Sequence, residues 1–167
     1  MFNKILSAVT AVAMTAAPSF ARIDAGTRDL INTVDASDIT VQIDSQYCID
    51  NPGFHGVYRY HGFKRQLILC PGGEVDADDH NTVRHEVWHA IQHCVNVGRG
   101  TDLDYPVNDD HAQVVEDART LLDPKYFQFI MNSYPEEVWL SEFEANIAAY
   151  LFDAEELEDM FKKVCLD

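Results

Sequence analysis

The stretch that organises this chain is HNTVRHEVWHAIQHCVNV, residues 80–97. Apolar side chains recur in it every three or four residues, which predicts an amphipathic helix with one buried face. These side chains are Val83, Val87, Ile91, Cys94 and Val95. Residues 85–89 read HEVWH, and side chains four residues apart project from the same face of a helix. We therefore expect His85 and His89 to point together into a groove, roughly opposite the buried face.

The segments around this helix predict an α+β fold. Two β-rich runs, residues 56–60 and 66–70, flank a Gly-containing turn and predict a hairpin. The polar segment 22–46 has one clear strand signal, at residues 39–43. Helices are expected at about 109–122, 125–131, 135–152 with Pro135 at the first helical position, and 153–165. Strands thus come first and helices follow: a small sheet, then the HEVWH helix, then a helical C-terminal half.

Composition limits the classes of protein to consider. The chain has 167 residues, of which 47% are hydrophobic and 24% charged, values typical of one globular domain. The formal net charge of −16 opposes binding to nucleic acid, because such binding depends on Lys and Arg contacts with phosphates. We therefore expect no nucleic-acid partner, and the sequence leaves the oligomeric state open.

The first residues predict export. Lys4 is followed by an apolar run at residues 5–17 and by Ser19-Phe20-Ala21, which places small residues where a signal peptidase cleaves. The run is shorter than the roughly 20 residues that span a bilayer, which disfavours a membrane anchor. We expect a signal peptide at residues 1–21 and one domain at 22–167, secreted or periplasmic, with no membrane association after cleavage.

All four cysteines lie in the expected mature chain. In an oxidising compartment an even number of cysteines indicates disulfides, although four allow three connectivities. We expect Cys48 to pair with Cys70 around the hairpin and Cys94 with Cys165, tying the C-terminus to the central helix. A four-cysteine zinc site is the alternative, but the chain has no CxxC pair.

An HExxH sequence on a helix suits zinc hydrolysis, with the two histidines as ligands and Glu86 as general base. The motif can occur by chance, and a catalytic zinc site needs a third protein ligand. Glu142 shares a helix face with small residues that allow another helix to approach, whereas Glu144 points roughly 160° away. We favour Glu142 as the third ligand and keep Glu144 as the alternative. Asn146, one turn after Glu142, either steadies the Glu142 carboxylate or is an ordinary amide on the helix surface.

The pairing of HExxH with Glu142-Phe143-Glu144-Ala145-Asn146, 52 residues after His89, resembles the gluzincin metallopeptidases. The resemblance covers roughly residues 66–152, with about ten specific positions. It implies a minimal zincin-like domain that binds Zn²⁺ through His85, His89 and Glu142 and hydrolyses a peptide or protein substrate. It also implies that the strand before the zinc helix is an edge to which the substrate adds by main-chain hydrogen bonds. In this chain that strand would contain Leu67, Ile68 and Leu69.

Other histidines and tyrosines of the chain are further candidates for roles in such a site. His93 suggests a three-histidine metzincin site, but on an unbroken helix it lies about 12 Å from His85. Metzincins also have a glycine three residues after the second histidine, where this chain has Gln92. His111, Tyr134 and Tyr150 are equal candidates for stabilising a developing oxyanion.

Two other interpretations remain open at this point. The chain could be a non-catalytic secreted metal-binding or interaction domain, in which case the site needs a fourth protein ligand. The histidines could also bind nothing. Trp88, which lies between them in the sequence, is expected to serve packing and not substrate recognition.

Overall fold

A computed structural model describes residues 23–61, 63–71, 77–101 and 105–167. The expected signal peptide, residues 1–21, lies outside these ranges. Among the described helices, none combines the length and the apolar character needed to cross a membrane.

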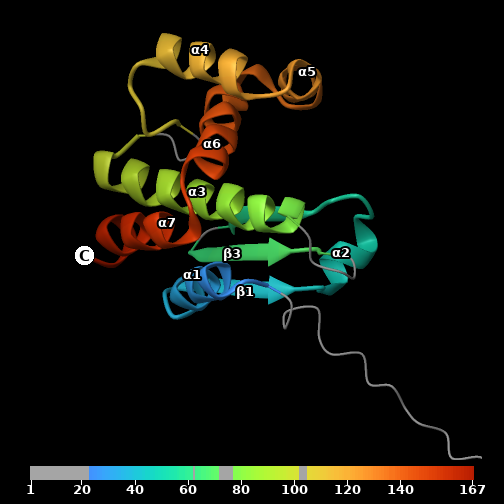
Figure 1. Cartoon of the computed structure of the whole chain (residues 1–167). Coiled ribbons are helices and arrows are strands. Elements are labelled where there is room, and N and C mark those ends of the chain that lie inside the picture. The colour runs from blue at the N-terminus through green and yellow to red at the C-terminus, as the bar shows by residue number, and fades with distance from the viewer. Residues whose placement is uncertain (1–22, 62, 72–76, 102–104) are drawn as a thin grey trace, which may run out of the picture.

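The described part of the chain is α+β (Figure 1). Strands and helices alternate at first, and the second half of the chain is helical. In chain order the elements are α1 (Ala25–Asp35), β1 (Ile39–Ile43), α2 (Gln46–Asp50), β2 (Gly56–His61), β3 (Lys64–Leu69), α3 (Ala77–Arg99), α4 (His111–Leu121), α5 (Pro124–Ser133), the 3₁₀ turn η2 (Glu136–Val138), α6 (Trp139–Leu151), α7 (Ala154–Phe161) and the short π-helical turn η3 (Lys162–Leu166).

Helix α1 was not expected from the polar segment 22–46, and the prediction that strands come first is wrong at this point. The Asp24 carboxylate caps the helix by accepting the main-chain N–H of Thr27 at 2.9 Å. Leu30, Ile31 and Val34 are buried one turn after another. This stripe at helical spacing is short and lies among polar residues, yet tertiary packing is enough to make the segment helical.

The sheet has the strand order β1-β3-β2. Strand β1 runs parallel to β3, and β2 pairs with β3 in the antiparallel direction of a hairpin. Leu67, Ile68 and Leu69 therefore lie on the central strand, whose two edges are both occupied. The prediction that they form the substrate edge is wrong. Within the described residues the strand with an open edge next to α3 is β2.

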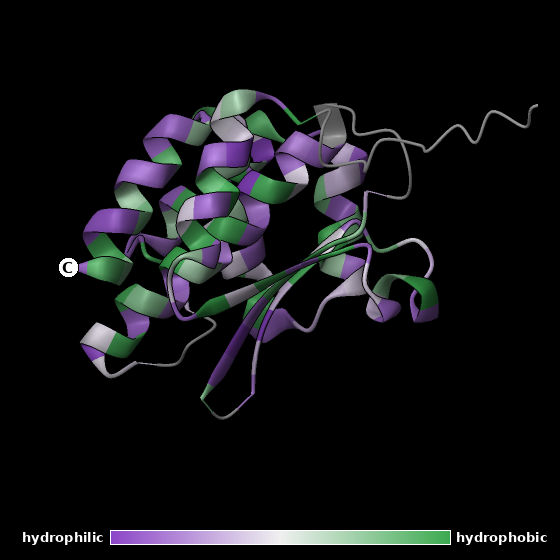
Figure 2. Cartoon of the chain, turned by 90° about the horizontal axis from the view of Figure 1, so that it is seen from below, coloured by the Kyte–Doolittle hydropathy of each residue, from purple (hydrophilic) through white to green (hydrophobic). Residues whose placement is uncertain are grey.

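Helix α6 connects two apolar clusters. The first lies between the sheet and α1, α3 and α7, with α3 running along the sheet in Figure 1. The second lies between α4, α5 and α6. Helix α6 contributes to both: Ala145 and Ala148 face the first cluster, and Phe143 and Ile147 face the second. Figure 2 shows the larger helices gathered on one side of the strands. The hairpin end of β2 and β3 extends beyond these helices.

Pro135 does not open the long C-terminal helix. It precedes the 3₁₀ turn η2, and α6 begins only at Trp139. The Ser141 hydroxyl donates to the Val138 carbonyl at 2.8 Å where the 3₁₀ turn passes into the α-helix. The tighter turn shifts the start of α6 by about one turn and leaves Glu142 in its first turn.

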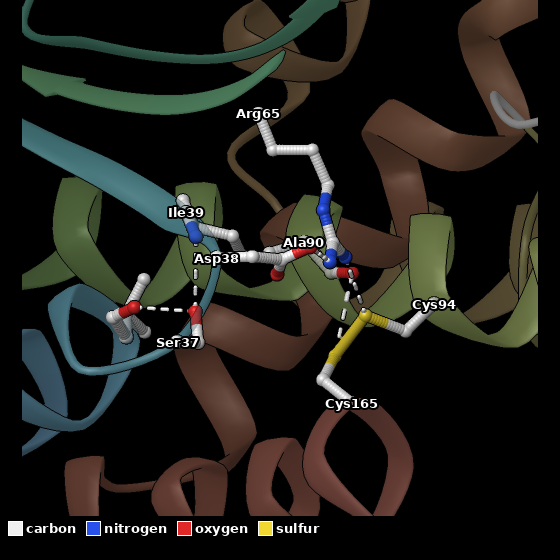
Figure 3. Close-up of a disulfide and its surroundings, with 8 residues drawn as sticks. Ser37, Asp38, Ile39, Arg65, Ala90, Cys94 and Cys165 are labelled. Carbon is white, nitrogen blue, oxygen red and sulfur yellow. Dashed lines mark hydrogen bonds and ion pairs between the residues drawn. A yellow bond between two sulfur atoms is a disulfide. The ribbon is translucent and has the colours of Figure 1, made fainter. Parts of the chain in front are cut away.

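The structure contains the two disulfides expected from the sequence, Cys48–Cys70 and Cys94–Cys165. Near the second, shown in Figure 3, the Arg65 guanidinium from β3 lies 3.4 Å from the Cys94 sulfur and forms an ion pair with Asp38. The described cysteines are thus all paired, a pattern that suits an oxidising compartment.

Candidate metal centre

His85 and His89 lie one turn apart on α3 and point the same way. Their Nε2 atoms are 3.0 Å apart, and both rings are only partly exposed. The opposite face of α3 carries Val83, Val87 and Ile91 into the first apolar cluster. Packing of this apolar face therefore orients the helix and directs both imidazoles away from the core.

Helix α6 brings Glu142, and not Glu144, to the two histidines. The Glu142 carboxylate oxygens lie 3.6 Å from His85 Nε2 and 3.5 Å from His89 Nε2. Among the described residues, these three side chains form the one group of metal-binding type. A zinc ion holds N and O ligands at about 2.0–2.2 Å, so a tetrahedral site separates its ligand atoms by about 3.3–3.6 Å. The two histidine nitrogens are slightly closer than this, at 3.0 Å, and each lies 3.5–3.6 Å from a different oxygen of the Glu142 carboxylate, so the donor set suits Zn²⁺.

The electrostatics of Glu142 favour a charged ligand. Burial alone would raise the pKa of its carboxyl. The polar contact with His85 and the charges of His89 and His85 outweigh burial and hold this pKa below its usual value. Glu142 is thus an ionised carboxylate at neutral pH, and it faces the point where the two imidazoles converge.

Glu86 is a buried carboxylate beside these three side chains. Its Oε2 accepts the main-chain N–H of Tyr58, from the open edge of β2, at 2.6 Å. Burial raises the pKa of Glu86 to about 7, against the lowering effects of His89 and of the Tyr58 N–H, with a further raising effect from Glu142. A carboxylate with this pKa is suited to take up and release a proton near neutral pH.

Strand β2 can pass this close to α3 because residue 56 is a glycine. A Cβ atom at Gly56 would lie 2.6 Å from Cγ2 of Thr82 and 2.9 Å from Cγ of Glu86. Both distances are shorter than van der Waals contact allows. The absent side chain thus leaves space for Glu86 under the edge strand.

Glu144 is buried on the other side of α6, 6% exposed, and serves the fold. Its carboxylate accepts four hydrogen bonds, from Nε1 of Trp88, Nε2 of Gln92 and the main-chain N–H groups of Val107 and Asn108. These contacts hold α3, α6 and the segment before α4 together. Trp88 also stacks on Phe152, in keeping with the packing role expected for it.

A cleft of about 370 Å³ opens over the cluster. Strand β2 forms one wall, the start of α6 forms the other, and His85, Glu86, His89 and Glu142 lie at the bottom. Tyr134 lines the cleft, and burial followed by the charge of Glu142 raises its pKa, so its phenol stays protonated and can donate a hydrogen bond.

The remaining candidates from the sequence lie elsewhere. Asn146 donates to the main-chain carbonyl of Glu142 at 2.8 Å, so the interpretation that it steadies the Glu142 carboxylate is wrong. His93 is buried against Tyr58 and Tyr60, away from the metal-type cluster. His111 packs on Tyr105, and Tyr150 is 63% exposed; neither lines the cleft.

Two residues of the site escaped the sequence analysis. Gln92 bonds to His89, and its place three residues after His89 on the same helix face was a usable signal. Gly56 opens β2, and a glycine inside a strand often marks a close approach of another element.

Comparison with protein-family models, with curated proteins and with solved structures found no match to this chain. Functional inference therefore depends on the motif and on the geometry of the cluster.

Proposed function

We propose that this chain is an exported zinc-dependent peptidase with a minimal zincin-like fold. The observation that carries the proposal is the convergence of His85, His89 and Glu142, whose nearest ligand atoms lie 3.0–3.6 Å apart, on the floor of a cleft. An HExxH helix beneath an edge strand, with a glutamate supplied by a later helix, supports the zincin-like assignment. The two disulfides support an oxidising compartment.

A zinc ion at this site supplies Lewis-acid chemistry, lowering the pKa of a water molecule and polarising a carbonyl oxygen. The protein contributes the base. Glu86 takes the proton of the attacking water on its carboxylate and passes it to the leaving amine nitrogen. The Tyr58 N–H holds one oxygen of that carboxylate, which fixes its orientation for the transfer.

The open edge of β2 is the proposed docking site for an extended peptide. Alternate residues of β2 bond to β3, and the His55 carbonyl accepts from Cys70 in this pattern. The main-chain groups of Gly56 and the carbonyl of Tyr58 therefore point away from β3, toward the cleft side, where the Tyr58 N–H donates to Glu86. A substrate strand laid along this edge would pass over the cluster. Tyr134, on the other wall, is placed to donate a hydrogen bond to the oxygen that becomes negative.

A non-catalytic metal-binding role is the rival proposal. A closed structural zinc site has four protein ligands. In the described ranges the cluster comprises three, and it lies at the floor of a cleft wide enough for a substrate. An open coordination position supports catalysis over a structural site.

The test is cleavage of an unstructured protein such as casein by the purified chain. We expect hydrolysis that a chelator abolishes and that added Zn²⁺ restores. Glu86→Gln is the matched control, because the amide keeps the shape of the side chain and cannot accept the proton. This variant should bind zinc as the wild type does and lose at least about 100-fold in kcat. Chelator-resistant cleavage, or full activity in Glu86→Gln, would refute the proposal.

A further inference from the structure

Gln92 is a buried polar side chain of α3 that has no part in the catalytic scheme above. Gln92 is 1% exposed, yet its amide lies directly behind the His89 ring. Its Oε1 is 2.8 Å from His89 Nδ1, the ring nitrogen that points away from Glu142. A buried amide in this position must have a partner for each of its polar atoms, because an unsatisfied one is costly.

The orientation of the Gln92 amide follows from its other contacts. Its Nε2 donates to the main-chain carbonyl of Ser141 at 3.0 Å and to Oε2 of Glu144 at 2.8 Å. Both partners are acceptors, so the opposite orientation would set the amide oxygen against two other oxygens. The oxygen therefore faces His89, and His89 Nδ1 must be the donor in this contact.

We propose that Gln92 is a positioning residue that fixes the tautomer of His89. With the proton held on Nδ1, the lone pair is on Nε2, the atom that lies 3.5 Å from Glu142 and 3.0 Å from His85 Nε2. Glu144 anchors the chain of bonds, since its carboxylate is held by the N–H groups of Val107 and Asn108. The segment before α4 is thereby linked through Glu144 and Gln92 to a metal ligand. The effect on zinc affinity depends on the proposed function; the tautomer itself does not.

The direct test is the tautomer of His89 in metal-free protein labelled with ¹⁵N-histidine, read from two-bond ¹H–¹⁵N correlations at a pH where imidazoles are neutral. We expect the wild type to carry the proton on Nδ1. In Gln92→Met the acceptor is lost while the length of the side chain is kept, and we expect the proton to distribute between the two nitrogens. Zinc affinity, measured by competition with a chromogenic chelator, should fall about 10- to 100-fold.

Asn96→Met is the matched control. Asn96 is the next buried amide along α3, and it holds the same neighbouring segment by donating to the carbonyl of Tyr105 at 2.7 Å. It makes this contact one turn beyond Gln92. A merely structural role for buried amides predicts equal effects of the two substitutions. We expect Asn96→Met to keep the wild-type tautomer and zinc affinity.

A wild-type His89 protonated on Nε2 would overturn the proposal without any variant. An unchanged tautomer in folded Gln92→Met would also overturn it. If the wild type shows the Nδ1 tautomer but binds no zinc, the proposed function fails and the role of Gln92 in fixing the ring stands.

Discussion

The two glutamates of α6 have different assigned roles, Glu142 as a metal ligand and Glu144 as a structural residue, and substitutions test this difference directly. Replacing Glu144 with alanine removes one acceptor from four donors at 2.7 to 3.1 Å. A buried donor left without a partner costs about 1–3 kcal/mol. Val107 and Asn108 lie in a segment where water can replace the carboxylate, whereas Trp88 and Gln92 are buried. We therefore expect Glu144→Ala to lower the free energy of unfolding by about 3–5 kcal/mol.

Glu142→Ala is the internal control for this prediction. Among the described residues the polar contacts of the Glu142 carboxylate are with the two imidazoles, and its burial is itself unfavourable. In metal-free protein we expect this substitution to change the free energy of unfolding by less than about 1 kcal/mol, in either direction. The assay is guanidinium unfolding with the disulfides intact and a chelator present, so that metal binding does not contribute. A loss below about 1 kcal/mol in Glu144→Ala, or an equal loss in both variants, would refute the assignment of the two roles.

Three further substitutions test the surroundings of the site. Gly56→Ala places a Cβ 2.9 Å from Cγ of Glu86 and should lower kcat at least about tenfold at unchanged zinc content. Gly98→Ala is the control and should keep the wild-type kcat, because its Cβ would meet nothing within 4 Å. Equal activities of the two variants would show that β2 has room to move. Tyr134→Phe should lower kcat about 10- to 100-fold and leave zinc binding intact, with Tyr150→Phe as the control outside the cleft; wild-type kcat in Tyr134→Phe would exclude the phenol as a donor. The pKa of His93 is lowered by burial and then by Arg65, so the unfolded chain binds its proton first as the pH falls below about 6.5. His93 therefore makes the chain less stable as the pH falls from 7 to 5, whereas Glu86, with its pKa raised to about 7, makes it more stable over the same range. Relative to the wild type, His93→Phe should shift the pH dependence toward greater stability at pH 5; the same pH dependence in both proteins would show that His93 does not contribute.

The sequence contained enough to locate the candidate ligands. The four-residue spacing of His85 and His89 follows from helix geometry alone, and the angle between Glu142 and Glu144 about α6 separates them without any tertiary information. In the structure Glu142 lies at the histidines and Glu144 lies in the core. Helix-face geometry does not reveal burial, however, and so it could not show that Glu144 is held by four donors.

The order of the strands could not be obtained in the same way. Which strand of a hairpin borders a third strand depends on contacts between distant segments, here β1 with β3. One local signal was available, since Leu67, Ile68 and Leu69 form a continuous apolar run that is typical of a strand buried on both faces. All three are in fact buried, whereas β2 has no buried residue. The open edge therefore lies one strand earlier than the family resemblance implied.

The hydrogen bond between Gln92 and His89 could be predicted only in part from the sequence. The spacing places both side chains on one face of α3, but the orientation of the amide depends on Ser141 and Glu144, some 50 residues later in the chain. Polar networks of this kind are determined by the packing of helices, here α3 against α6, and become visible only once that packing is known.

The most direct measurement is the zinc content and coordination of the purified chain, by elemental mass spectrometry and X-ray absorption, in the wild type and in Glu142→Ala. The proposed site predicts one zinc per chain, with two imidazole nitrogens and oxygen ligands at about 2.0–2.2 Å. It also predicts that Glu142→Ala loses the metal under the same dialysis, while His85 and His89 are unchanged. A wild-type chain without zinc, or a Glu142→Ala variant that retains it with the same coordination, would contradict the site.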